Sequence, residues 1–279
     1  MKRKGSILLA LAAAMLALVG VARAITFGQL DTTNKYTYVG AMVADFDGEK
    51  DILCSGTLIS PTVFVTASHC TAYLESIWTP AHDVWVTFDP TFDQSSPLLR
   101  GTYHTNPLYG GPDHSDPSDI AVIVLDSPVS GITPARLPTL NYLATIPLKN
   151  QRFTAVGYGT VRNAKQKGPQ TLFFDGQRRY ADQSFRSLTK SWLNLSMNPS
   201  VGSGGTCYGD SGGPHFLGSS NLVVGITITG DRWCRATDET YRTDTAAARN
   251  FLKTYVTLPL RDQGQRAGAA SPAPAASVT

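Results

Sequence analysis

The stretch Gly209-Asp210-Ser211-Gly212-Gly213-Pro214 decides how the rest of this chain is interpreted. One serine stands among glycines, with an acid directly before it. Glycines on both sides let the backbone turn sharply and leave the serine hydroxyl accessible. They also allow backbone N–H groups to face an oxygen on which negative charge develops. Because a serine hydroxyl is a weak nucleophile without a base, the stretch predicts a histidine and an acid elsewhere in the chain.

Both partners precede the serine. The candidate base is His69, and the candidate acid is Asp119, which comes directly before the apolar run Ile120–Leu125. The glycine-rich stretch also fits the serine turn of α/β-hydrolases, but those enzymes place their histidine well after the serine. Here the only histidine after Ser211 is His215, which lies four residues on, inside the same loop. The order His, Asp, Ser therefore argues against the α/β-hydrolase arrangement.

Four separated stretches extend the pattern over about residues 25–260. They are Ile25-Thr26-Phe27-Gly28, Cys54-Ser55-Gly56-Thr57-Leu58-Ile59 continuing to His69-Cys70, Asp119-Ile120-Ala121, and Cys207 to Pro214. In this order they resemble the secreted trypsin/chymotrypsin-type serine proteases of bacterial style. One departure is Ala67-Ser68-His69-Cys70, where the family usually has Ala-Ala-His-Cys. We expect the added hydroxyl to be tolerated.

The resemblance implies a catalytic role for each residue. Ser211 attacks the carbonyl carbon of a peptide bond, His69 takes and returns the proton, and Asp119 holds the imidazole. The N–H groups of Gly209 and Ser211 are expected to form the oxyanion hole. Export would also free the amino group of Ile25, which the resemblance pairs with the carboxylate of Asp210. A capping role for Asp210 is the alternative.

Other residues could compete for these roles. Asp113 and Asp116 lie close to Asp119, but only Asp119 is followed at once by an apolar strand. We expect the remaining histidines to be ordinary loop or surface residues; these are His82, His104, His114 and His215.

Substrate specificity is the least determined feature. Trypsin-like members bind Lys or Arg through an Asp six residues before the serine, and here that position is Gly205, followed by Thr206. Gly230 matches the glycine that keeps the pocket mouth open, with Ile228 just before it. Glu239 would place a carboxylate on the far wall and attract a basic side chain. The alternative is an apolar pocket, which we favour because the spacing after the last cysteine differs from the family's.

The start of the chain is typical of a secretory signal peptide over residues 1–24. Lys2-Arg3-Lys4 precedes the apolar run Ile7–Val21, and Ala22-Arg23-Ala24 resembles a cleavage site. A membrane anchor is the alternative, but the run is short for a span of about 20 residues. We therefore expect an extracellular protein, with no membrane contact once the signal is removed.

Export permits disulfides, and four cysteines allow three pairings. The resemblance implies the pairs Cys54–Cys70 and Cys207–Cys234. A metal site is the alternative, but the chain has no C-x-x-C pair, and the acids between residues 75 and 93 lack a calcium-ligand spacing. We expect no metal and no cofactor.

Charge argues against nucleic acid as a partner. The formal net charge is +3 and charged residues make up only 16% of the chain, without a basic stripe. The expected partners are protein or peptide substrates and protein inhibitors, and we expect a monomer.

Short runs rich in Val, Ile, Thr and aromatics alternate with turn residues, which favours an all-β fold. The expected strands are Tyr36–Ala44, Thr57–Thr66, Val84–Phe88, Ile120–Leu125, Phe153–Val156 and Leu222–Ile228. The resemblance implies two antiparallel six-stranded β-barrels of the chymotrypsin type, at about 25–138 and 146–260, with the active site between them. We expect a C-terminal helix over Thr245–Tyr255 and a flexible tail over 261–279, whose composition offers little to bury.

The sequence thus predicts a serine endopeptidase that acts through an acyl-enzyme. Two alternatives stay open, a catalytically inactive binding protein on a protease scaffold and a serine esterase. Retention of all three catalytic residues argues against the first, and the His, Asp, Ser order argues against the second.

Overall fold

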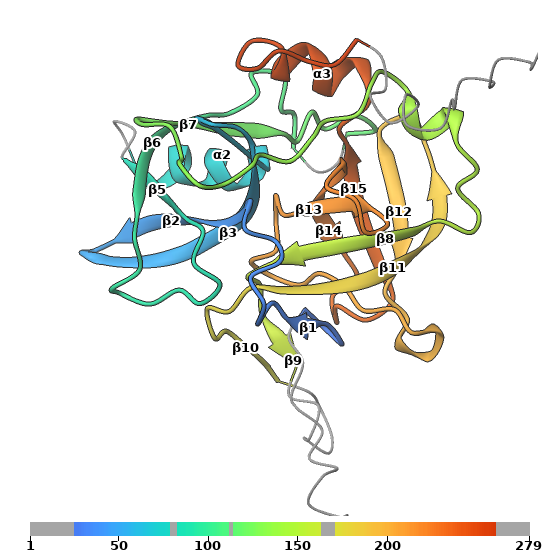
Figure 1. Cartoon of the computed structure of the whole chain (residues 1–279), viewed down its shortest axis with the longest axis horizontal. Coiled ribbons are helices and arrows are strands. Elements are labelled where there is room, and N and C mark those ends of the chain that lie inside the picture. The colour runs from blue at the N-terminus through green and yellow to red at the C-terminus, as the bar shows by residue number, and fades with distance from the viewer. Residues whose placement is uncertain (1–24, 79–82, 112–113, 163–170, 261–279) are drawn as a thin grey trace, which may run out of the picture.

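Short runs of β-branched and aromatic residues, separated by turns, form strands over most of this chain. In the computed structural model, which describes residues 25–78, 83–111, 114–162 and 171–260, two six-stranded antiparallel barrels lie side by side (Figure 1). The expected all-β architecture is confirmed. The expected signal peptide and the expected flexible tail both lie outside the described residues.

The first barrel closes in the order β2-β3-β4-β7-β6-β5, with β5 pairing back to β2. Its strands are β2 (Val39–Phe46), β3 (Glu49–Ser60), β4 (Val63–Thr66), β5 (Val84–Thr87), β6 (Leu99–His104) and β7 (Ala121–Leu125). All four residues of β4 are buried, as are four of the five in β7, so this part of the barrel belongs to the core. The expected strand Thr57–Thr66 is in fact two strands, because Pro61 and Thr62 form a turn inside it.

The second barrel runs β8-β11-β12-β15-β14-β13 and closes through β13–β8 and β11–β8 pairing. Its strands are β8 (Arg152–Gly157), β11 (Arg179–Leu188), β12 (Trp192–Ser196), β13 (Pro214–Leu217), β14 (Val223–Gly230) and β15 (Thr237–Arg242). The smaller elements are β1 (Gln29–Leu30) on the edge of β11, the pair β9 (Val161–Arg162) and β10 (Leu172–Phe173), and the 3-10 turns η1 (Tyr142–Thr145) and η2 (Pro199–Val201).

Within the described residues, two α-helices accompany the barrels. The expected C-terminal helix is present as α3 (Ala246–Leu252), and the hydroxyl of Thr245 caps it by accepting from the amide of Ala248 at 3.1 Å. The helix α2 (Ser68–Ile77) was not expected, because its buried face carries Ser, Cys and Thr besides one Leu and so gives little apolar periodicity. Neither α-helix of the described chain is long and apolar enough to cross a membrane.

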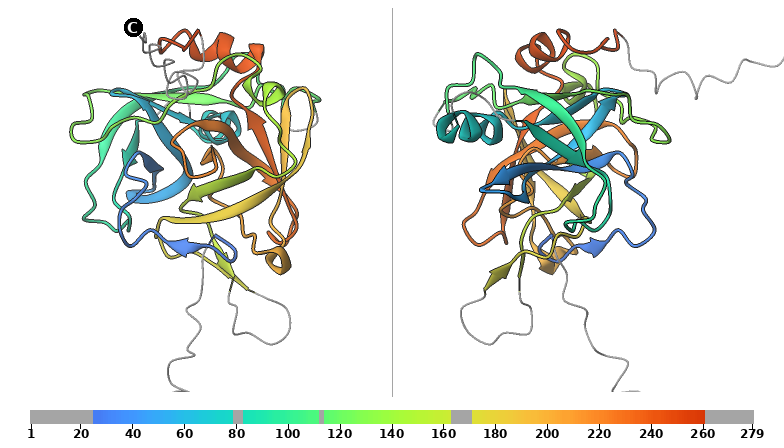
Figure 2. Two further views of the ribbon diagram at one scale, coloured as in Figure 1. Left: turned by 45° about the vertical axis from the view of Figure 1, so that its right-hand side comes forward. Right: turned by 90° about the vertical axis from the view of Figure 1, so that its left-hand side faces the viewer.

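The two ends of the described chain cross over between the barrels. Near the N-terminus, β1 pairs with β11 of the second barrel, and the ring of Tyr36 stacks on Phe216 of β13 with centroids 6.0 Å apart. Near the C-terminus, α3 lies across one end of the molecule (Figure 1 and Figure 2). The ring of Tyr255, just after α3, packs against His104 of β6 in the first barrel at 5.2 Å.

One buried ion pair joins the N-terminal segment to both barrels. Arg178 and Asp31 are both almost fully buried, and the Arg178 Nε lies 2.9 Å from an Asp31 carboxylate oxygen. The guanidinium also donates to the carbonyl oxygens of Val39 and Phe88 and to the hydroxyl of Tyr158, at 2.9, 2.9 and 3.1 Å. Its remaining nitrogen donates to Asn34. All three guanidinium nitrogens thus find acceptors, which lie in three separate parts of the fold, and this suits the fork geometry of arginine.

Removing one member of this pair should destabilise the protein strongly. Arg178→Met leaves a buried carboxylate without its cation, so we expect a loss of about 3–5 kcal/mol in the free energy of unfolding. Guanidinium chloride denaturation measures it. The matched control is Arg100→Met, because the Arg100–Asp83 pair is exposed on both sides and screened by solvent, so its loss should leave the denaturation midpoint almost unchanged. Equal midpoints for the two variants would contradict the role given to Arg178.

Candidate active site

His69 is held by a buried carboxylate. It lies in the first turn of α2, where Nδ1 of its ring is 2.9 Å from one carboxylate oxygen of Asp119. The other oxygen accepts from the His69 backbone N–H, also at 2.9 Å. Asp119 is 1% exposed, whereas the imidazole is about one-third exposed. The carboxylate therefore fixes the ring with its proton on Nδ1, which leaves Nε2 as a proton acceptor.

Residues 209–213 of the second barrel, here called the serine loop, pack against β3 and against the residue before α2 in the first barrel. The carbonyl of Ser211 accepts from the amide of Ser55 on β3 at 2.9 Å, and the hydroxyl of Ser55 donates to the carbonyl of Gly209 at 2.9 Å. A Cβ on Gly212 would lie 2.6 Å from the backbone nitrogen of Ala67, so only glycine permits this approach. Ser211 thus lies beside the turn that carries His69.

The amides of the serine loop divide into two groups. Those of Asp210, Gly212 and Gly213 donate to backbone carbonyls at 3.0, 2.8 and 2.8 Å. Those of Gly209 and Ser211 have no acceptor among the described residues. Two free donors beside a serine are what an oxyanion site requires. No hydrogen bond links the Ser211 hydroxyl to the imidazole in the described structure, and such bonds often tighten only with substrate present.

The two acids that competed with Asp119 do not contact His69 in the described structure. Asp116 accepts from the hydroxyl of Tyr241 at 2.9 Å and from the amide of Ser118 at 3.2 Å. Asp113 lies outside the described residues. Asp119 alone of the three is seen to hold the imidazole.

A cavity of about 320 Å³ opens beside Ser211. Its walls are Thr206, Cys207, Tyr208, Ser211, Thr227, Ile228, Thr229, Gly230, Asp231, Arg232 and Cys234. Three of the residues expected to bind substrate, Thr206, Ile228 and Gly230, line it. A larger hollow of about 620 Å³ beside α3 is lined by neither His69 nor Ser211.

The other two residues expected to bind substrate do not line the cavity. Gly205 is buried, and a Cβ on it would lie 2.5 Å from Nε2 of Gln183 and closer still to the sulfur of Met197, so these side chains fill its space. Glu239 is exposed. The expectation that its carboxylate lies on the pocket wall is wrong, because side chains alternate along β15 and position 239 faces outward.

Asp238, the acid next to Glu239, was not predicted to belong to the site, and it is buried. Asp238 is 0% exposed, and its Oδ2 accepts from the Thr206 hydroxyl at 2.7 Å and from Gln183 Nε2 at 2.7 Å. Nε2 of His215 lies 3.0 Å from the same oxygen. His215 was expected to be an ordinary loop or surface residue, and this is wrong because it is fully buried on β13. The inward positions of β15 were the signal that could have found the pair.

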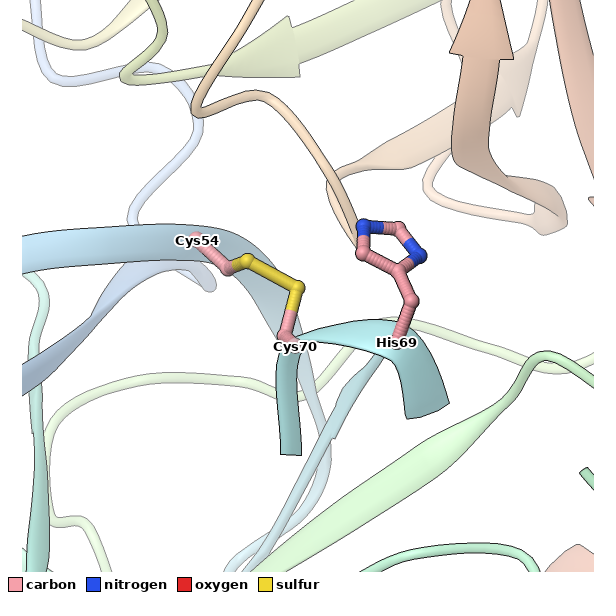
Figure 3. A group of neighbouring side chains, drawn as sticks. All are labelled: Cys54, His69 and Cys70. Carbon is pink, nitrogen blue, oxygen red and sulfur yellow. A yellow bond between two sulfur atoms is a disulfide. The ribbon is translucent and has the colours of Figure 1, made fainter. Parts of the chain in front are cut away.

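Both expected disulfides are confirmed. Cys54–Cys70 ties α2 to β3, and Cys207–Cys234 ties the serine loop to the far side of the cavity. Cys54, Cys70 and His69 bring their donor atoms within 4.8 Å of one another. The two sulfurs are bonded to each other and the imidazole points away from them (Figure 3), so this group does not offer thiolates to a metal.

Asp210 is buried behind the cavity without a cation in the described structure. One of its oxygens accepts from the amide of Gly159 and the other from that of Cys207, both at 2.8 Å. Burial raises the pKa of its carboxyl to about 7. Ile25 is also buried, and the next residue, Thr26, pairs with Gly205 through an amide-to-carbonyl bond of 3.0 Å. The start of the described chain is therefore inserted beside the cavity.

The fold is of the chymotrypsin type, and the comparisons give the family. A family model described as Trypsin matches residues 29–252, so the chain belongs to the trypsin family. Kallikrein-8 of Mus musculus is 27% identical over 195 residues, 68% of this chain and 70% of that protein. Chymotrypsin of Phaedon cochleariae is 26% identical over 218 residues, 75% of this chain and 74% of that protein. Both are animal proteins, and the bacterial style expected from the sequence has no support here.

Solved structures agree on the fold. A structure of HL collagenase has a TM-score of 0.62 at 18% identity and covers 83% of this chain and 99% of its own. A structure of HBP has a TM-score of 0.59 at 17% identity and covers 89% of this chain and 99% of its own.

The unusual serine before His69 should stabilise the site. The Ser68 hydroxyl donates to the carbonyl of Ile120 at 2.9 Å and accepts from the amide of Asn106 at 3.1 Å, all within buried surroundings. Ser68→Ala restores the usual family residue but leaves that amide without a partner. We expect a loss of about 1–3 kcal/mol in unfolding free energy, measured by denaturant titration. A variant as stable as the parent would show that the two hydrogen bonds contribute nothing.

Proposed function

We propose that this protein is a secreted serine endopeptidase in which Ser211, His69 and Asp119 form the catalytic triad. The observation that carries the proposal is that the buried Asp119 carboxylate hydrogen-bonds both the ring and the backbone N–H of His69. These two hydrogen bonds leave Nε2 of the imidazole free at the edge of the serine loop. Membership of the trypsin family supports the reaction class.

The mechanism follows from these positions. Nε2 of His69 takes the proton of the Ser211 hydroxyl as its oxygen bonds to the carbonyl carbon of the substrate. The resulting imidazolium, paired with Asp119, returns the proton to the leaving amine as the C–N bond breaks. Water then attacks the acyl-enzyme, again with His69 as base, and releases the acid and the free serine.

The free amides of Gly209 and Ser211 are the proposed oxyanion hole. They are the two amides of the loop without an acceptor in the described structure, so they can donate to the tetrahedral intermediate without breaking an existing bond. The loss of one such donor typically lowers turnover by about 100- to 1,000-fold. The substrates would be proteins or peptides, and protein inhibitors could occupy the same cavity.

The triad predicts a specific ranking of variants. Ser211→Ala and His69→Ala should each lower kcat by about a millionfold, because each removes a member that acts only with the others. Asp119→Asn should cost about ten-thousandfold by favouring the wrong tautomer. Asp116→Asn is the control, since this acid bonds Tyr241 and not His69. Near-normal turnover of Asp119→Asn on a peptide anilide would exclude Asp119 as the triad acid.

Two assays separate the competing functions. A fluorophosphonate probe should label Ser211, and the label should be absent from Ser211→Ala. No labelling of the folded protein would favour an inactive binding scaffold. Digestion of casein separates a protease from an esterase that accepts only esters.

The proposed secretion also leads to an activation step. Cleavage after Ala24 would give Ile25 a free ammonium close to the buried carboxylate of Asp210. A buried carboxylate without a cation is costly, so this pairing would order the oxyanion loop. N-terminal sequencing of the active protein should begin at Ile25.

The pKa of Asp210 predicts how stability depends on pH. Because burial raises this pKa to about 7, protein that retains residues before Ile25 favours the protonated carboxyl when folded. That contribution to stability is present below about pH 4 and is lost as the pH rises towards 7. Protein that begins at Ile25 should not show this loss, because the ammonium stabilises the carboxylate. Denaturant midpoints at pH 4.5 and 7.5 test the difference.

The control for this prediction is Asp210→Asn in the longer protein, which should remove the loss between the two pH values. The same pH dependence in protein that begins at Ile25 and in the longer protein would contradict the pairing.

A further inference from the structure

A carboxylate lies directly behind the floor of the cavity. Asp238 of β15 is opposite Gly230 of β14 in the antiparallel register, and Gly230 is part of the cavity wall. The link to the cavity is Thr206, which lines it and donates its hydroxyl proton to Asp238 Oδ2 at 2.7 Å. The carboxylate therefore sits one side chain away from any group that fills the cavity.

The direction of the Thr206 hydroxyl sets the chemistry of the floor. A hydroxyl has one proton and two lone pairs, and this proton is committed to Asp238. On the side that faces the cavity, the Thr206 hydroxyl oxygen can therefore only accept a hydrogen bond. Its acceptor strength is increased because its proton is held by a carboxylate. A cationic N–H donor from a substrate is the matching group, whereas a substrate carboxylate would meet another acceptor.

The Asp238 carboxyl behind the floor is ionised. Burial alone would raise the pKa of the Asp238 carboxyl, but His215, Gln183 and Thr206 together lower it below its usual value, so the group is ionised. Nε2 of His215 lies 3.0 Å from Oδ2 of Asp238, and its Nδ1 is buried without a partner in the described structure.

The usual route to a charged pocket is closed in this chain. The space above Gly205 is filled by Met197 and Gln183, so an acid at that position would have no room. The second buried carboxylate nearby, Asp210, receives two backbone amides and is the proposed partner of the Ile25 ammonium. Asp238 keeps one buried oxygen, Oδ1, without a partner in the described structure.

We propose that Asp238, acting through the Thr206 hydroxyl, makes the cavity select substrates with Lys or Arg immediately before the cleaved bond. This inference rests on the proposed endopeptidase function and replaces the apolar pocket favoured from the sequence. A long cationic side chain donates to Thr206 and lies close to the Asp238 charge. Asp238 and Thr206 are specificity-determining residues and take no part in bond breaking.

The test compares matched peptide anilides that differ only in the last residue, Arg, Lys, Phe or Leu. We expect the wild type to have a higher kcat/KM for Arg and Lys than for Phe and Leu. Asp238→Asn keeps the shape and removes the charge, so the Arg-to-Phe ratio should fall by about 100-fold. Thr206→Val removes the hydroxyl and should lower the ratio in the same direction. Thr206→Ser keeps the hydroxyl, so its Arg-to-Phe ratio should return to the wild-type value.

The matched control is Glu239→Gln, which removes the exposed acid next to Asp238 and should leave the Arg-to-Phe ratio at its wild-type value. Fluorophosphonate labelling counts the folded active sites, so the ratio is measured even if Asp238→Asn folds poorly. Should that variant not fold at all, the Thr206 pair decides the outcome.

Two results would overturn the inference. One is a labelled wild type that prefers Phe or Leu, and the other is an Arg-to-Phe ratio that does not change in Asp238→Asn or Thr206→Val. Either leaves the endopeptidase function standing. A wild type that neither labels nor cleaves any substrate overturns the proposed function itself, and the inference with it.

Discussion

The buried guanidinium of Arg178 is the interaction on which the rest of this structure depends. It neutralises Asp31 in the N-terminal segment and donates to backbone carbonyls of the first barrel and to Tyr158 of the second. A buried charge of this kind is tolerated only when every donor is satisfied. The two barrels and the N-terminal segment must therefore meet in one relative position for the charge to be accommodated at all.

That fixed position is what the active site needs. His69 and Asp119 come from the first barrel, whereas Ser211 comes from the second. The serine loop reaches them by the close approach of Gly212 to Ala67 and by hydrogen bonds to Ser55. A shift of about 1 Å between reacting groups can cost about 100-fold in rate. The contacts at the barrel junction are thus part of the catalytic geometry, even though none of them touches substrate.

The sequence predicted the parts of the structure in which chemistry restricts the residue type. A nucleophilic serine needs glycines, a base and an acid, and this requirement singled out the proposed triad Ser211, His69 and Asp119, of which the structure places Asp119 on His69. The strands were found because β-branched runs between turns are local signals. The turn inside Thr57–Thr66 and the helix α2 were missed, since the helix has only one large apolar residue on its buried face.

The buried polar pairs could not be found in this way. Arg178 and Asp31 are 147 residues apart, and His215 and Asp238 are 23 apart, so their pairing exists only once the barrels are closed. The candidate pocket acid from the sequence, Glu239, is exposed and its neighbour Asp238 is buried, because the register of β15 decides which of two neighbouring acids faces inward.

The crossing of the chain ends has a consequence for how the protein is made. The ring contact between Tyr255 and His104 joins the first barrel to residues about 150 positions later. The first barrel closes with its own strands, but this contact forms only after the last part of the second barrel has been synthesised. Contacts of such long range close late and slow the folding rate. A nascent chain of this protein should therefore complete the packing between its two barrels late, after nearly all of its residues have been translated.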